Sequence, residues 1–169
     1  MKPLHCPNCG TSFVRVAHQE GLVENLLSRV NVFPFRCQLC TNRFRAFYSG
    51  GRNNPQSFDR RQYTRLPASI EAQVLDYKQQ PVINRITDIS MDGCTLQTIG
   101  FPKGAFIELV MKPTVEEEMI RIETAMVCSV HPLSMGIRFL EVSREHYRRL
   151  AQVILGLLVG QGLDHTFNG

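Results

Sequence analysis

Two pairs of cysteines constrain the fold of this chain more than any other feature of its sequence. Each pair is spaced Cys-x-x-Cys, and residues 10–36 separate the two pairs. A turn of this spacing points both sulfurs to the same side, and two such turns complete the tetrahedral shell that zinc prefers. The four candidate ligands are Cys6, Cys9, Cys37 and Cys40. The sequence therefore predicts a closed, structural zinc site in a small zinc ribbon over residues 1–48.

The segment between the two pairs exceeds the roughly 15 to 20 residues of the commonest four-cysteine spacing. A helical insertion explains the excess, because apolar residues recur there at helical spacing. They are Leu22, Val23, Leu26, Leu27 and Val30. His5 and His18 are alternative metal ligands, although four cysteines already suffice. Cys94 and Cys128 lie outside the pairs, and each is expected to be a small buried hydrophobic residue rather than a reactive thiol.

The rest of the chain has the pattern of a small antiparallel β-barrel. Turn-forming residues fill the segment 49–57, which we interpret as a linker. Alternating apolar and polar residues begin at Ile70, Ile120 and Leu133, as in half-buried strands. Turn signals at residues 78–81, 101–104 and 131–132 separate about six short strands. This spacing favours a closed barrel or a sandwich over residues 58–169.

Within residues 58–169, the apolar pattern of three segments predicts which of their residues are buried. Residues 120–130 should bury Ile120, Ile122, Thr124, Met126, Cys128 and Val130. Residues 133–139 should bury Leu133, Met135, Ile137 and Phe139. A closing helix is expected to begin after Ser143 as its N-cap. Its apolar stripe is Tyr147, Leu150, Ala151, Ile154, Leu157 and Leu158.

Charge and hydropathy narrow the class of function. Residues 1–65 carry ten Lys or Arg and three Asp or Glu, whereas residues 66–169 carry nine and twelve. The basic first part favours an anionic partner. No apolar run is long enough to span a membrane, and the start lacks a secretion signal, so a cytoplasmic protein is expected. No nucleophile, base and orienting residue recur together, and we do not expect an enzyme.

Two short motifs flank the first strand of the predicted barrel. Arg61 and Arg65 form RxxxR, and Asp88, Ser90 and Gly93 form [DN]xSxxG further along the chain. In this order, and followed by a barrel pattern, the motifs resemble the signature of the PilZ domain family. The resemblance extends over residues 58 to about 160. The last alternating strand and the helix after it are also similar to the family.

The resemblance implies a mainly β fold, a six-stranded antiparallel PilZ-like barrel with a C-terminal helix, in a bacterial receptor for cyclic di-GMP. An arginine-bearing arm would close on the barrel and signal to an unidentified protein partner. The implied ligand site consists of Arg60, Arg61, Arg65, Asp88, Ser90 and Gly93. A guanidinium bonds phosphate oxygens, pairs with guanine and stacks on bases. Asp88 is suited to accept from guanine N–H groups, Ser90 to donate or accept, and Gly93 to admit ligand or neighbouring backbone.

Other interpretations stay open. The ribbon and the basic first part form a nucleic-acid-binding module, or the barrel is a ligand-free protein adaptor. The arginines are then a solvated basic linker and residues 88–93 an ordinary turn. The ribbon has few aromatic residues for base stacking beyond those that can form its small core. These are Phe33, Phe35, Phe44, Phe47 and Tyr48. Whether one or two ligand molecules bind also stays open.

Overall fold

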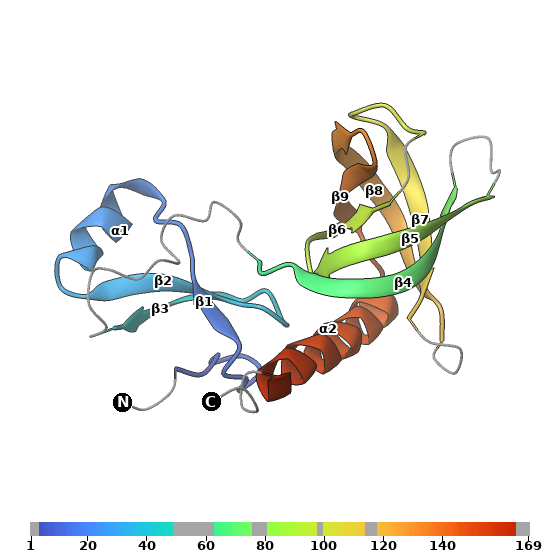
Figure 1. Ribbon diagram of the computed structural model, residues 1–169. Helices are drawn as coiled ribbons and strands as arrows, with labels where there is room; N and C mark the ends of the chain where they lie inside the picture. Colours follow the sequence, from blue (N-terminus) through green and yellow to red (C-terminus); the bar gives the residue numbers. More distant parts are fainter. Residues whose placement is uncertain (1–3, 49–62, 76–80, 98–99, 114–117, 165–169) are drawn as a thin grey trace. The chain divides into compact units, whose positions relative to one another are not determined.

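The computed structural model describes residues 4–48, 63–75, 81–97, 100–113 and 118–164. The chain divides into two units, Met1–Thr64 and Arg65–Gly169, which are drawn with their strands and helices labelled in Figure 1. The predicted linker at residues 49–57, together with Arg60 and Arg61, lies outside the described residues. Within the described ranges, no helix is both long enough and apolar enough to cross a membrane.

The first unit is built on a three-stranded antiparallel sheet in the order β1-β2-β3. Its elements are β1 (Val14–Val16), α1 (Gly21–Ser28), β2 (Val32–Cys37) and β3 (Arg43–Phe47). Phe35 on the central strand is 3% exposed, and its ring stacks on Phe44 at 5.9 Å. Tyr48 meets the rings of Phe33 and Phe35 edge-on. These aromatic residues therefore pack on one another as a small core, whereas Phe47 is exposed.

The helix predicted between the cysteine pairs is confirmed as α1, but its buried residue is a glutamate. The apolar residues on and just after the helix are exposed: Leu22, Val23, Leu26 and Val30. Glu24 is 3% exposed, and its carboxylate accepts from the backbone N–H of Glu20 at 2.7 Å. Arg43 and Arg45 on β3 donate to the same carboxylate at 2.6 and 3.2 Å. Ion pairs to the sheet therefore hold this face of α1.

Replacing Glu24 by glutamine is expected to destabilise the ribbon by about 1 to 3 kcal/mol, because charge-assisted bonds to a carboxylate are lost. The bond from the Glu20 N–H, with Arg43 and Arg45, lowers the pKa of Glu24 below its ordinary value of 4.5. A carboxyl with a lowered folded pKa stabilises the fold above its unfolded pKa, and this contribution is lost as the pH falls below about 4.5. Thermal unfolding from pH 7 to pH 3 should show a smaller acid loss for Glu24→Gln than for wild type. Equal losses of stability with falling pH in the two proteins would contradict the role of the Glu24 carboxylate.

The second unit is a closed barrel in the order β4-β5-β6-β9-β8-β7, with antiparallel neighbours throughout (Figure 1). Its strands are β4 (Leu66–Leu75), β5 (Pro81–Ser90), β6 (Gly93–Leu96), β7 (Phe106–Lys112), β8 (Ile120–His131) and β9 (Ser134–Glu141). The fully buried side chains of its interior include Leu66, Ile86, Ile89, Leu96, Leu109, Met111, Ile122 and Ile137. The predicted six-stranded antiparallel barrel is thus confirmed.

The C-terminal helix α2 (Arg144–Asp164) packs against β4 and β8. Ser143 caps it as predicted, because its hydroxyl accepts from the backbone N–H of His146 at 3.4 Å. The side-chain carboxylate of Glu123 on β8 accepts from the Ser143 N–H at 3.0 Å. Leu150 and Ile154 of the predicted stripe are almost completely buried. The cap and the stripe together dock α2 on the barrel.

The alternation predicted along β8 holds only for its first residues. Ile122 is buried as expected, but the pairing with β7 shifts register between Ile122 and Ala125, where β8 has one residue more than β7. After this shift the fully buried residues are Ala125 and Val127 rather than Met126. A β-bulge adds one residue to a strand and turns every following side chain to the opposite face. The second half of the predicted set is therefore wrong.

The turn predicted at residues 131–132 joins β8 to β9 as expected. Leu133 was predicted to be buried, but it lies in this turn and is 78% exposed. Met135 and Ile137, two and four residues later, are buried as predicted. The period of two simply continues through the turn, so the sequence pattern does not mark the residue at which β9 begins.

The two unpaired cysteines differ in burial. Cys94 in β6 is completely buried, as predicted. Burial raises the pKa of this thiol far above its ordinary value, so it stays protonated at neutral pH. Cys128 in β8 is half-buried. Cys94 therefore behaves as a small core residue.

Candidate functional site

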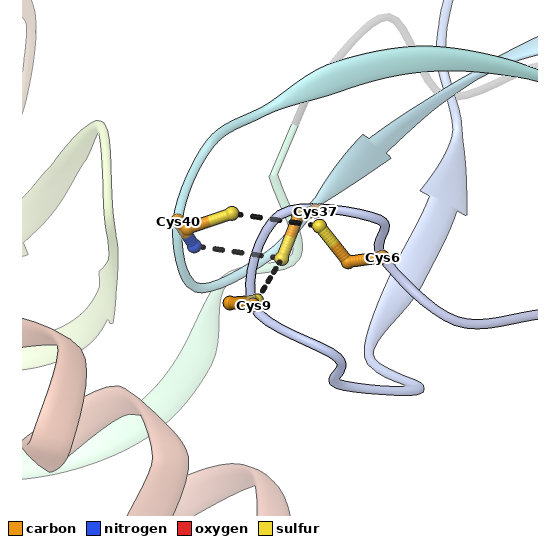
Figure 2. Close-up of side chains that lie close together, drawn as sticks. All are labelled: Cys6, Cys9, Cys37 and Cys40. Atoms are coloured by element: carbon orange, nitrogen blue, oxygen red, sulfur yellow. Dashed lines mark hydrogen bonds between the residues drawn. The ribbon is translucent and has the colours of Figure 1, made fainter.

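The four sulfurs of the two cysteine pairs point toward one another (Figure 2). The Sγ atoms of Cys6 and Cys40 lie 3.5 Å apart, those of Cys9 and Cys37 lie 3.6 Å apart, and all four lie within 4.8 Å of one another. A disulfide needs about 2.05 Å between sulfurs. Zinc–sulfur bonds of about 2.3 Å place the corners of a tetrahedron about 3.8 Å apart. The cluster therefore has the size of a four-thiolate zinc site.

Both Cys-x-x-Cys turns, which we call the first and second knuckles (residues 6–9 and 37–40), end in the same backbone conformation. Gly10 follows the first knuckle with φ 74°, and Thr41 follows the second with φ 59°. The backbone N–H groups of Leu39 and Cys40 both point at the sulfur of Cys37 at 3.4 Å. A left-handed φ suits glycine but strains a β-branched threonine. The geometry of the Cys-x-x-Cys turn, and not the intrinsic preference of threonine, therefore accounts for the left-handed φ of Thr41.

Metal binding at this cluster would require Cys37 to lose its thiol proton. Burial raises the pKa of the Cys37 thiol to about 12. Zinc binds the thiolate form, so a bound ion would displace the proton that this group otherwise keeps at neutral pH. Four protein sulfurs leave no coordination position for a substrate, which suits a structural role.

A second cluster lies at the start of the barrel, where the two arginine and aspartate motifs meet. Arg65 Nη1 donates to Asp88 Oδ1 at 2.9 Å and to Thr95 Oγ1 at 2.5 Å. Thr95 Oγ1 in turn donates to Asp88 Oδ1 at 3.0 Å. Among the described residues, Nε and Nη2 of Arg65 have no hydrogen-bond partner. The cluster therefore holds the guanidinium through one nitrogen, Nη1.

Arg65, which the resemblance places on an arginine-bearing arm, is partly buried at the start of the barrel. Its side chain and that of Asp88 are each 29% exposed, and the two form an ion pair. Thr95 did not feature in the sequence prediction. A two-residue turn after Ser90 places Thr95 opposite Asp88 on β6, as the observed register has it. Counting back across that turn would have found Thr95 from the sequence.

Ser90 and Gly93 stabilise the turn between β5 and β6. Ser90 is 5% exposed; its hydroxyl donates to the carbonyl of Gly93 at 3.2 Å and accepts from the N–H of Asp92 at 3.4 Å. A Cβ on Gly93 would lie 2.1 Å from the carbonyl oxygen of Ile137 on β9. The glycine is therefore required by the neighbouring backbone. The remaining predicted site residues, Arg60 and Arg61, lie outside the described part of the chain.

Comparison with known families decides what kind of barrel this is. The model of the PilZ domain matches residues 59–156, more than half of the chain. The chain belongs to the PilZ domain family. No curated protein sequence matches it.

Solved PilZ structures share the fold. The PilZ domain of YcgR from Escherichia coli, solved with c-di-GMP, matches with a TM-score of 0.54 and 16% identity over 66% of this chain and 100% of that one. YcgR from Escherichia coli in complex with c-di-GMP matches with a TM-score of 0.55 and 15% identity over 89% and 76%. MrkH of K. pneumonia in its apo state gives 0.56 and 16% over 89% and 78%.

The PilZ signature of this chain is thus split between two structural roles. Arg65 and Asp88 form an accessible ion pair, whereas Ser90 and Gly93 hold the adjacent turn and the seam between β6 and β9. Thr95 completes the ion pair from the neighbouring strand. The turn therefore keeps Asp88 and Thr95 side by side at a fixed spacing.

Gly93→Ala is expected to destabilise the PilZ barrel by about 1 to 3 kcal/mol, because the new methyl group overlaps backbone that cannot rotate away. Gly136→Ala is the matched control. Its Cβ would lie 2.4 Å from Ser129 Oγ, a side-chain atom that can move. Denaturant unfolding should show the larger loss for Gly93→Ala. An equal or larger loss for Gly136→Ala would contradict the assignment.

Proposed function

We propose that this chain is a receptor for cyclic di-GMP that signals to a protein partner and carries one structural zinc ion. The observation that most supports this is the contact between Arg65 and Asp88, which brings the two halves of the PilZ signature together. The proposal includes a zinc ribbon over residues 1–48, a linker over 49–57 and a barrel over 58–169. A cytoplasmic, non-enzymatic role belongs to the same proposal.

The chemistry of the site suits this ligand. Cyclic di-GMP carries two phosphodiester charges and two guanines, and an arginine fork can bond phosphate, pair with guanine O6 and N7, and stack on a base. Arg65 has donors that no described residue uses. Asp88 can accept from guanine N–H groups. Because Asp88 already neutralises Arg65, the ligand has to compete with this ion pair, which favours a dianion over a neutral molecule.

The proposed site is completed by residues on both sides of this pair. Arg60 and Arg61 would close over the ligand from the segment before β4, and Ser90 and Gly93 would support it through the turn. Similar barrels accommodate the ligand, since two of the matching structures are PilZ proteins in complex with c-di-GMP. The movement of the arginine segment would then be the signal that a partner reads.

A calorimetric titration of the full chain tests the proposal. Cyclic di-GMP should bind saturably with a micromolar or lower Kd, whereas cyclic di-AMP and GTP should bind far more weakly. Raising the salt concentration should weaken the complex only modestly, because few phosphates are contacted. Protein that ignores cyclic di-GMP at high micromolar concentration but binds DNA with a steep salt dependence would overturn the proposal in favour of nucleic-acid binding.

A further inference from the structure

The two residues immediately before Arg65 are held by Gln38 in the second knuckle of the ribbon and by Arg36 next to it. The backbone N–H of Thr64 donates to the side-chain oxygen of Gln38 at 2.7 Å. Arg36 donates to the hydroxyl of Tyr63 at 3.3 Å, and its guanidinium lies 5.7 Å from the centre of the Tyr63 ring. All of these contacts lie within the unit Met1–Thr64. The middle of the RxxxR motif is therefore part of the ribbon's hydrogen-bond network.

Gln38 stands between two of the candidate zinc ligands, Cys37 and Cys40. Its side chain is buried, and its amide donates to the carbonyl of Arg36 at 3.3 Å while its backbone N–H donates to Phe13 at 2.9 Å. The fold of the knuckle thus orients the side-chain oxygen of Gln38 that accepts from the Thr64 N–H. Since a four-thiolate knuckle depends on its metal for folding, the orientation of the Gln38 side chain also depends on zinc.

The chain then passes directly from Thr64 to Arg65, which pairs with Asp88 in the barrel. A binding residue whose neighbours are already ordered loses less conformational freedom when the ligand binds. If only a fraction of the protein is in the conformation that binds the ligand, the apparent Kd rises by the inverse of that fraction. Contacts that order the backbone at Tyr63 and Thr64 are therefore expected to raise the affinity for the ligand.

We propose that Gln38 and Arg36 are positioning residues for the cyclic di-GMP site, through which zinc in the ribbon raises the affinity of the barrel for its ligand. This inference rests on the proposed function. The coupling runs from zinc to the second knuckle, from Gln38 to the Thr64 backbone, and along one peptide bond to Arg65. By linkage, cyclic di-GMP must raise the affinity for zinc by the same factor.

The first test compares variants of the full, zinc-loaded chain by calorimetry with cyclic di-GMP. Gln38→Leu removes the acceptor for Thr64 at similar volume and should raise the Kd about threefold to tenfold. Leu39→Ala changes the other residue within the same knuckle, whose side chain has no hydrogen-bonding group, and should leave the Kd unchanged. Zinc content should stay at that of wild type in both. An unchanged Kd for Gln38→Leu would overturn the inference.

Tyr63→Phe provides a second variant outside the knuckle, for use if Gln38→Leu fails to fold. It removes only the hydroxyl that accepts from Arg36, and it should weaken binding in the same direction. A Kd equal to that of wild type in a folded Tyr63→Phe protein would count against the inference.

The second test removes zinc from wild type and Gln38→Leu with a chelator. Stripped wild type should bind at least as weakly as loaded Gln38→Leu, and the two stripped proteins should bind alike, because the knuckle no longer aims residue 38. Cyclic di-GMP should also slow or oppose the extraction of zinc from wild type but not from Gln38→Leu. Equal affinities with and without zinc would overturn the inference while leaving the receptor function intact. If zinc-loaded wild-type protein did not bind cyclic di-GMP, both the proposed receptor function and this inference would be wrong.

Discussion

A Cys37→Ser substitution is expected to abolish zinc binding and to unfold the ribbon. Wild-type protein should hold about one zinc per chain, because its four sulfurs already have the spacing of a tetrahedral site. Structural zinc contributes about 10 to 16 kcal/mol of apparent binding free energy in small zinc domains at neutral pH. This exceeds the contribution of burying Phe35, the one buried side chain among the core aromatic residues of the ribbon, which is worth about 1.5 to 3 kcal/mol.

Metal analysis and near-ultraviolet circular dichroism of the purified protein would measure both effects. The matched control is Cys128→Ser, which changes a half-buried cysteine outside the two pairs. It should keep the full zinc content and the aromatic signal of Phe33, Phe35, Phe44 and Tyr48. Full zinc occupancy in Cys37→Ser would show that the site is not the four-cysteine cluster.

Arg65→Ala is expected to weaken cyclic di-GMP binding by ten- to a hundredfold. Each charge-assisted hydrogen bond that it removes is worth roughly 1.5 to 3 kcal/mol. A micromolar complex has only about 8 kcal/mol in all. Loss of this arginine therefore removes a large share of the affinity, and calorimetry at fixed salt concentration measures it directly.

The same substitution tests the ion pair with Asp88, because Arg65 is half-buried rather than fully exposed. Stability should fall by no more than about 1 kcal/mol, since partly exposed ion pairs contribute little. Arg121→Ala is the control: Arg121 also pairs with a carboxylate, Glu108 at 2.6 Å, but lies outside the signature. It should leave ligand binding unchanged. Equal losses of affinity in the two variants would assign the effect to net charge and not to the site.

The sequence alone determined the features that depend on local chemistry. The spacing of Cys6, Cys9, Cys37 and Cys40 was enough to predict a cluster that the structure confirms, because a Cys-x-x-Cys turn places its own two sulfurs together. The period of two and the turn signals predicted about six short strands in a closed barrel or a sandwich, and the resemblance to the PilZ family implied the six-stranded barrel that is observed. The cap at Ser143 marked the start of α2. Each of these signals is contained in a few neighbouring residues.

Features that depend on contacts between residues far apart in the chain could not be predicted from the sequence. The extra residue of β8 between Ile122 and Ala125, in its pairing with β7, reverses which side chains of β8 are buried, and no local pattern encodes that partner. Arg43 and Arg45 lie far from Glu24 in the chain, yet they make it the buried residue of α1. The bond from Thr64 to Gln38 spans 26 residues. Pairings of this kind follow from the global arrangement of strands, which composition and periodicity leave open.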